Sequence, residues 1–236
     1  MSCTIWTPRE VSSEAAAWRG RVWRVVEAQH VAATMKLVDD RDEQDLLETL
    51  LESGKPAAAA GTESLDYLLA TPFRYPPRHG GSRFRAATDP GVFYAAQTLR
   101  TAAAELGYWR WRFLLDAVEL PRIDPVAQTA FRAEVATTAV DLRRPPFDAD
   151  AATWQHPHDY LPTQRFTRVA RDAGVGGIQY QSVRDVEAGW CLALLRPDGF
   201  AARKPDLLKA LSTPRCVFPT SCPATRNAAR AASNMA

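Results

Sequence analysis

The clearest hydrophobic pattern in the chain is a helical stripe within "DDRDEQDLLETLLESGKP", at positions 39–56. Apolar residues three or four positions apart share one helix face, and the stripe consists of Leu46, Leu47, Leu50 and Leu51. The first turn can be capped and charged by Asp39, Asp40 and Asp42. Gly54 and Pro56 end the segment. We therefore predict an amphipathic helix with an acidic outer face, which is solvated unless a partner binds it.

Other apolar runs predict helices and strands that interleave along the chain. Thr98 to Leu115 has helical spacing and is expected to be a buried helix, and residues 162–174 form a further helix that ends at a glycine. Strands are predicted at 91–96, 131–142, 177–183 and 190–195. The run "VWRVVEAQHVAAT" from Val22 fits either a strand or the start of a helix. This alternation predicts a mixed α/β or α+β single domain.

Composition and charge narrow the classes of protein. The chain has 236 residues and is 46% hydrophobic, which is enough for one domain with a real core. Its formal charge is only +2, so nucleic acid is not the expected partner. No run approaches the roughly 20 apolar residues that span a bilayer, and the N-terminus lacks a signal-peptide core, so no membrane association is expected.

Cysteine usage points to a reducing compartment. The four cysteines are scattered without a CxxC pair, which fits neither a disulfide framework nor a zinc ribbon. We therefore expect a cytoplasmic protein. His156, His158 and Asp159 are residue types that ligate metals, but their spacing matches no familiar ligand set, and a surface loop is expected there instead. The "GVGG" run at 174–177 reads as a helix stop and turn, since it follows a helix and precedes a strand.

An arginine-rich loop precedes the strand at 91–96. Prolines and glycines are expected to keep it out of regular structure: Pro72, Pro76, Pro77, Gly80 and Gly81. Four arginines fall within it without one acid: Arg74, Arg78, Arg83 and Arg85. Such a loop is either a binding surface or a solvated basic loop, and its composition does not decide between the two.

Three residues suited to handling a nucleotide fall on successive elements of this region. Arg83 lies in the loop, Tyr94 in the strand and Glu105 in the helix. Each alone has an ordinary structural explanation, as a solvated arginine, a core aromatic or an exposed charge. Glu105 is the least ordinary, because it is the only charged residue between Arg100 and Arg110 and lies among small residues. A carboxylate in such a place needs a partner or a substrate hydroxyl.

Four motifs resemble the RES-domain family, the toxin half of bacterial toxin–antitoxin pairs. They are "GSRFR", "GVFYAA", "TAAAELGYWR" and "GIQYQSVRD". The resemblance implies a fold similar to ADP-ribosyltransferase toxins and cleavage of the nicotinamide–ribose bond of NAD, with NAD as substrate and no bound cofactor. It carries over Arg83, Tyr94, Glu105 and Ser182 as the active-site set, with Arg74 and Tyr75 as further NAD-binding candidates. It also implies a protein antitoxin as partner.

The same resemblance suggests a division of the chain. Residues 1–60 are expected to be an N-terminal extension with the amphipathic helix, 61–200 the RES-type catalytic domain, and 201–236 a partly disordered tail. The acceptor of the ribosyl group stays open between water, phosphate and a protein target. Two other functions stay open as well, a non-catalytic interaction module and nucleic-acid binding through the arginine loop. A homo-oligomer and a toxin–antitoxin hetero-oligomer are both compatible with the sequence.

Overall fold

The computed structural model describes residues 4–27, 40–76, 81–117, 122–123, 127–212 and 216–217. Within these ranges no helix combines the length and the apolar character that crossing a membrane requires. The predicted tail after Cys222 lies outside the described residues, as do Asp39 and three residues of the predicted arginine-rich loop, Pro77, Arg78 and Gly80.

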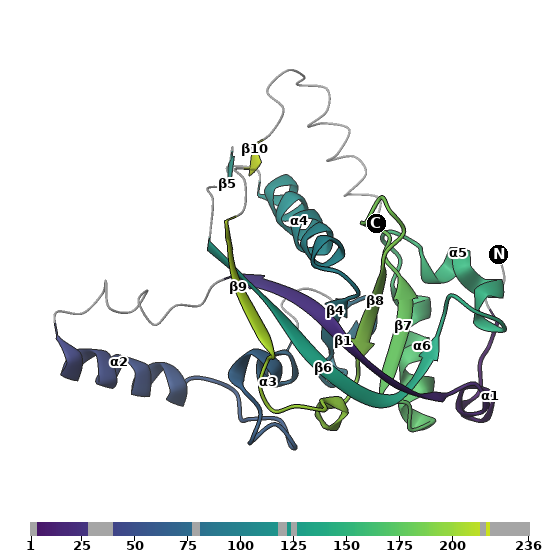
Figure 1. The fold of residues 1–236 in the computed structure, drawn as a ribbon, viewed down its shortest axis with the longest axis horizontal. Helices are drawn as coiled ribbons and strands as arrows, with labels where there is room; N and C mark the ends of the chain where they lie inside the picture. Colours follow the sequence, from purple (N-terminus) through teal and green to yellow (C-terminus); the bar gives the residue numbers. More distant parts are fainter. Residues whose placement is uncertain are drawn as a thin grey trace.

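A six-stranded mixed sheet forms the centre of the fold (Figure 1). Its order is β1 (Ala16–Glu27), β4 (Phe93–Ala96), β8 (Trp190–Leu194), β7 (Gly177–Gln181), β6 (Ala127–Asp141) and β9 (Leu207–Ser212). Because β1 also pairs with β6 along its whole length, five of the strands close on themselves and β9 is added at the edge of β6. The β6–β7 pair is parallel, and the other pairs of this sheet are antiparallel. The predicted mixed α/β class is therefore confirmed, in the form of a barrel-like sheet.

Strand β1 settles the alternative that periodicity left open. Its residues pair from Ala16↔Ala139 to Glu27↔Gln128, so the "VWRVVE" run is a strand. It belongs to the central sheet, although it lies in the segment that the sequence analysis assigned to an extension. The strands predicted at 91–96, 131–142, 177–183 and 190–195 are confirmed as β4, β6, β7 and β8, and β6 begins four residues earlier than predicted.

Two apolar clusters fill the two sides of this sheet. One contains Phe84, Phe147, Phe166 and Tyr180 and lies under α1 (Pro8–Ser13), α5 (Ala151–Trp154) and α6 (Leu161–Asp172). The other contains Phe73, Phe93, Phe131 and Phe200, with α3 (Tyr67–Arg74) packed on it. Short 3-10 turns, η2 (Phe147–Asp150) and η3 (Pro197–Gly199), and a two-stranded β5 (Arg122–Ile123) and β10 (Cys216–Val217) sheet complete the described fold.

The arginine-rich segment is more regular than its prolines suggested. Pro72 lies inside α3, where neighbouring packing of Phe73 and Leu69 outweighs the loss of one backbone donor. Residues 81–86 form a small hairpin of β2 (Gly81–Ser82) and β3 (Arg85–Ala86). The predicted loop was therefore wrong at both ends. Gly81, at φ +109, is required there because a Cβ would lie 2.2 Å from the Arg85 carbonyl oxygen.

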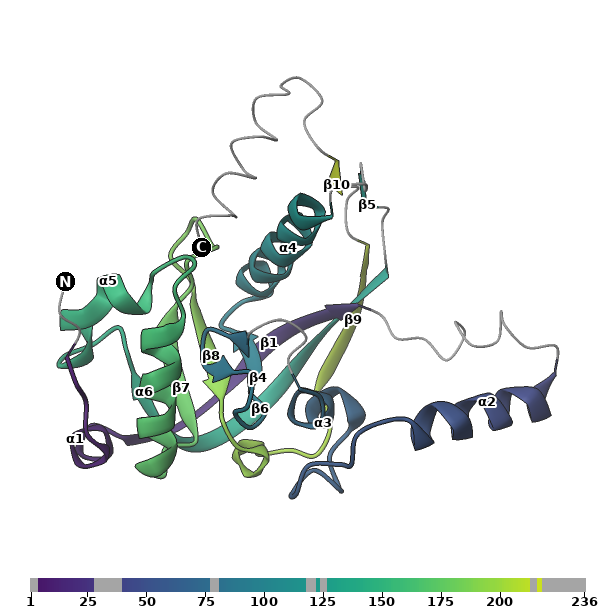
Figure 2. The same cartoon turned by 180° about the vertical axis from the view of Figure 1, so that it is seen from behind.

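Helix α4 (Leu99–Asp116) begins at Thr98, whose hydroxyl accepts a hydrogen bond from the Thr101 amide. Its position is as predicted, but it is not a buried helix. Its buried residues are Thr101, Ala102 and Leu114, while Trp109 is 47% and Phe113 is 59% exposed. The helix lies along one side of the sheet in both cartoon views (Figures 1 and 2), so only one face is covered.

The predicted amphipathic helix is present as α2 (Arg41–Ser53), and Asp40 accepts from the Glu43 amide at 2.9 Å. Figures 1 and 2 show it standing away from the sheet. Three leucines of its stripe are correspondingly exposed: Leu46 and Leu50 at about 60% and Leu51 at 49%.

Candidate active site

A cavity of about 240 Å³ opens between β1, β4 and α4. Aromatic and aliphatic side chains make up most of its wall, and four charged residues join them. The lining consists of Trp23, Arg24, Val25, Ser82, Arg83, Tyr94, Ala95, Ala96, Ala102, Glu105, Leu106, Trp109, Tyr160, Tyr180, Arg184 and Cys191. Three of the four residues proposed from the motifs, Arg83, Tyr94 and Glu105, therefore face one space although they come from three elements.

Ser182, the fourth residue of that set, lies directly behind the carboxylate. Its hydroxyl donates a hydrogen bond to Oε1 of Glu105 at 2.5 Å and accepts from the main-chain amides of Arg184 and Asp185 at 3.2 Å. The thiol of Cys191 lies 3.9 Å from the same oxygen. Burial and the Glu105 charge raise the pKa of the Cys191 thiol, which therefore stays neutral beside the carboxylate. Glu105 is thus oriented from one side and open to the cavity on the other.

A buried aspartate ties the loop that carries Ser182 to the helix that carries Glu105. Asp185 accepts from the Thr101 hydroxyl at 2.7 Å and from the Arg100 guanidinium, both in the first turn of α4. These contacts lower the pKa of the Asp185 carboxyl, the Thr101 hydrogen bond most. Gly189, at the end of this loop, packs closely against α4. Only glycine fits there, because a Cβ would lie 2.3 Å from the Thr101 hydroxyl.

Arg83 is a buried arginine, and part of its guanidinium is already hydrogen-bonded within the protein. It is 8% exposed, and Nη1 donates to the carbonyl oxygens of Trp154 at 2.7 Å and His156 at 3.0 Å. Its guanidinium carbon stacks 4.8 Å from the centroid of the Tyr160 ring. These contacts hold Arg83 against one wall of the cavity, where its remaining N–H groups can donate hydrogen bonds to a bound molecule.

Tyr94 joins strand β4 to the β2–β3 hairpin. Its hydroxyl lies 2.8 Å from the Ser82 hydroxyl and accepts from the Phe84 amide at 2.9 Å. Burial raises the pKa of Tyr94 to about 12, so the phenol is neutral at physiological pH. Tyr94 therefore holds the hairpin that presents Arg83, in addition to lining the cavity.

Sequence reasoning missed two arginines and two tyrosines of the cavity, Arg24, Arg184, Tyr160 and Tyr180. Arg24 donates to the Tyr94 carbonyl oxygen at 2.7 Å, while its buried Nε has no hydrogen-bond partner among the described residues. Burial lowers the pKa of Arg24 to about 10. The available signal was an arginine within the apolar run "VWRVVE", where a strand residue needs a reason to be charged.

The remaining candidates lie elsewhere. Arg74 donates to the Pro56 carbonyl oxygen and Tyr75 accepts from Arg85 through its own carbonyl, and neither lines the cavity. In the part of the chain that the structure describes, no three His, Cys, Asp or Glu side chains gather as a metal-binding group. His156 instead accepts from the amides of His158 and Asp159 and so shapes its own loop.

The charged residues that line the cavity give it a net positive charge. Arg24, Arg83 and Arg184 contribute three positive charges, and Glu105 is the one acid among the lining residues of the described ranges, which leaves a net +2. A low-dielectric wall strengthens this field. The arrangement can bind a doubly anionic group and, at Glu105, stabilise a positive charge that forms next to it. The fold and site therefore define a mixed α/β domain with a cationic pocket built around one carboxylate.

Comparison with known proteins agrees with this description. The model of the RES domain matches residues 55–218, and the chain belongs to the RES-domain family. A solved structure that it resembles is a chain of the M. tuberculosis MbcT–MbcA toxin–antitoxin complex, with 13% sequence identity and a TM-score of 0.51 over 95% of this chain and 96% of that one. That likeness concerns the fold. A search of the curated proteins found no match.

Proposed function

We propose that this protein is a toxin that cleaves the nicotinamide–ribose bond of NAD at the cavity around Glu105. The observation that carries the proposal is the placement of a single carboxylate, oriented by Ser182, in a pocket that also holds three arginines. Membership of the RES-domain family supports the same reading. The similarity of the fold to that of ADP-ribosyltransferase toxins, which the family resemblance implies, is part of this proposal.

Cleavage of this bond requires mainly electrostatic stabilisation from the enzyme. The nicotinamide of NAD is cationic, and when the C1′–N bond breaks the electron pair stays on the ring nitrogen, so nicotinamide leaves neutral without a general acid. The ribose then carries oxocarbenium character, which a preorganised carboxylate stabilises. In this mechanism Glu105 opposes the developing charge and accepts from a ribose hydroxyl. A nucleophile adds to C1′ and releases its proton to solvent.

The other residues would bind and orient the substrate. Aromatic walls from Trp23 and Tyr94 suit a planar nicotinamide ring. Arg83, whose position is set by two carbonyl oxygens and the Tyr160 ring, would contribute hydrogen bonds to a phosphate oxygen. Ser182 would act through Glu105, because its hydroxyl already donates to that carboxylate.

Release of nicotinamide from NAD by the purified chain tests the proposal. Wild-type protein should release nicotinamide, and Glu105→Gln should lose about 10² to 10³ in kcat, the typical effect of removing one preorganised electrostatic group. Glu14→Gln, which changes an exposed glutamate outside the cavity, is the matched control and should behave as wild type. Equal rates in all three proteins would exclude the carboxylate mechanism.

The mass of the second product identifies the acceptor. ADP-ribose indicates water, ADP-ribose 1-phosphate indicates phosphate, and a protein gaining the mass of ADP-ribose indicates transfer to a target. A binding module without catalysis would instead give no product with any acceptor.

We also propose that an antitoxin protein binds this chain. The fold relative comes from a toxin–antitoxin complex, and a cytoplasmic NAD-cleaving enzyme would need to be silenced in its own host. Induced expression of the wild-type chain alone should lower cellular NAD and arrest growth. Glu105→Gln should do neither, and co-expression of a genuine antitoxin should restore both.

A further inference from the structure

A row of alternating arginine and tyrosine side chains runs from the cavity to the surface of α4. Arg83 stacks on Tyr160, whose hydroxyl lies 3.4 Å from Nη2 of Arg184. The guanidinium carbon of Arg184 in turn lies 3.4 Å from the centroid of the Tyr108 ring. Such cation–π contacts hold a guanidinium flat against an aromatic face. Arg184 is therefore ordered between two elements, α4 and the loop before α6.

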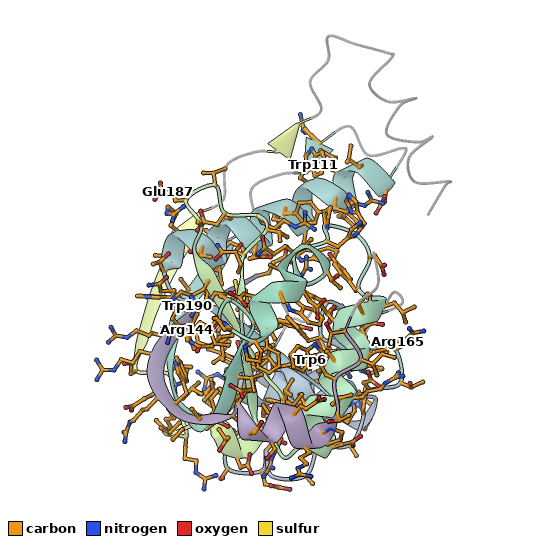
Figure 3. All side chains as sticks on the ribbon, turned by 90° about the vertical axis from the view of Figure 1, so that its right-hand side faces the viewer. Trp6, Trp111, Arg144, Arg165, Glu187 and Trp190 are labelled. Atoms are coloured by element: carbon orange, nitrogen blue, oxygen red, sulfur yellow. The ribbon has the colours of Figure 1, made fainter. Side chains whose placement is uncertain are left out.

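The row continues into exposed aromatic rings. The Tyr108 ring lies 5.5 Å from that of Trp109 and 5.9 Å from that of Trp111. Trp109 lines the cavity and is 47% exposed, so it spans the mouth. Trp111 is 46% exposed and can be found on α4 at the top of the view in Figure 3.

Arg184 has a charge that the described protein does not neutralise. Nη2 donates to the Pro157 carbonyl oxygen at 2.6 Å, and within the described ranges Arg184 forms no ion pair. Its main-chain amide donates to the Ser182 hydroxyl, which donates to Glu105. Arg184 lines the cavity and is partly exposed, so its unpaired guanidinium lies at the rim of the cavity.

The size of the cavity leaves part of a dinucleotide outside. At about 240 Å³ it is smaller than the roughly 300–1,000 Å³ pockets that enclose a drug-sized ligand, and NAD is larger than such a ligand. If the nicotinamide riboside end lies at Glu105, the diphosphate and adenosine must lie at the mouth. The groups found there are the guanidinium of Arg184 and the half-exposed indole of Trp109.

We propose that Arg184, Tyr108 and Trp109 form a second subsite, which binds the diphosphate and adenine of a dinucleotide and makes the enzyme prefer NAD to nicotinamide mononucleotide. This inference rests on the proposed function. Arg184 donates to the diphosphate through its free N–H groups, and the adenine stacks on the indole of Trp109. Affinity for the remote half of the substrate then adds to binding without altering the chemistry at C1′.

Kinetics with two substrates test the subsite. For Arg184→Met, KM for NAD should rise roughly ten- to a hundredfold, the effect of losing charge-assisted hydrogen bonds, with kcat within twofold. Trp109→Ala should raise KM for NAD about tenfold. With nicotinamide mononucleotide, which lacks the adenosine half, the KM of both variants should differ from that of wild type by less than their KM for NAD does. Arg165→Met removes an exposed arginine of α6, labelled in Figure 3, and is the control for a general loss of surface charge.

Binding of ADP separates this inference from the proposed function. ADP carries the diphosphate and adenine but no nicotinamide, so its calorimetric titration into Glu105→Gln protein reports the subsite even if no substrate is cleaved. One ADP should bind per chain, and its Kd should rise roughly ten- to a hundredfold on adding Arg184→Met and about tenfold on adding Trp109→Ala, while circular dichroism stays unchanged. ADP binding that ignores both substitutions, or no ADP binding at all, would overturn the subsite. NAD cleavage could still be observed in that case and would leave the proposed function intact.

Discussion

The Ser182 hydroxyl donates a hydrogen bond to Oε1 of Glu105 at 2.5 Å, although 77 positions separate the two residues in the chain. Ser182 is 4% exposed and receives two main-chain amide hydrogen bonds, so its hydroxyl proton is directed at the carboxylate. A short hydrogen bond to a charged acceptor fixes the orientation of that acceptor. Glu105 therefore has a defined direction before any substrate arrives.

Removal of this hydroxyl should weaken catalysis more than it weakens the fold. For Ser182→Ala we expect kcat for nicotinamide release to fall about 10- to 100-fold, the value of one hydrogen bond to a charged group. Ser182→Thr keeps the hydroxyl and should retain more activity than the alanine variant. Steady-state kinetics on both proteins, with thermal melting as the folding check, provide the measurement. Equal activity of Ser182→Ala and wild type would show that Glu105 needs no orientation.

Asp185 should act on the reaction through Ser182. Asp185→Asn replaces a buried anionic acceptor of Arg100 and Thr101 by a neutral amide, which should cost about 1–3 kcal/mol in the free energy of unfolding. Activity should also fall, because the loop that presents Ser182 loses its attachment to α4.

A double-mutant cycle on kcat distinguishes positioning from simple destabilisation. If Asp185 acts through Ser182, Asp185→Asn should have little further effect on kcat in a Ser182→Ala background. The loss of stability should persist in that background. Fully additive effects on kcat would contradict the positioning role.

Two glycines near α4 should respond oppositely to alanine. A Cβ at Gly189 would lie 2.3 Å from the Thr101 hydroxyl and 2.6 Å from Asp185 Oδ2, so Gly189→Ala should destabilise the fold by about 1–3 kcal/mol. At Gly107, inside α4, such a Cβ would meet nothing within 4 Å beyond the helix's own backbone and the adjacent residues, and Gly107→Ala should stabilise the fold by about 0.5–1 kcal/mol. Denaturant unfolding of both variants measures the two free-energy changes. If both substitutions stabilised the fold, the loop that contains Gly189 would have to shift at little cost to accommodate the added methyl group.

The buried phenol of Tyr94 predicts a loss of stability in strong base. Burial raises its pKa from 10.0 to about 12, so between these values the unfolded chain releases a proton that the native protein retains. Stability from this group is fully present below pH 10 and is lost as the pH rises towards 12. Thermal melting at pH 9, 10 and 11 should show a steeper decline for wild type than for Tyr94→Phe. If the melting temperatures of both proteins fell in parallel, the loss of stability would come from other groups. Tyr180 is one of them, because burial also raises its pKa.

The local pattern of the sequence was sufficient for the three longest described helices and for four strands of the central sheet. Helices α2, α4 and α6 and strands β4, β6, β7 and β8 lie where periodicity and stop signals predicted them, since those signals act within a few residues. Errors arose where packing outweighed the local signal. Pro72 is inside α3, and the helical stripe of α4 proved to be partly exposed because the sheet covers only one of its faces.

By itself the sequence determined which elements form and, through its family motifs, that Arg83, Tyr94, Glu105 and Ser182 deserve to be tested together. Only the tertiary structure decided which of them touch, that Arg24 and Arg184 join the cavity, and that Asp185 ties the serine loop to α4. The physical reason is that closure of the sheet, through the β1–β6 pairing, brings together side chains from distant parts of the chain. Periodicity reports the neighbours of a residue within one element, and it carries no information about contacts made across that closure.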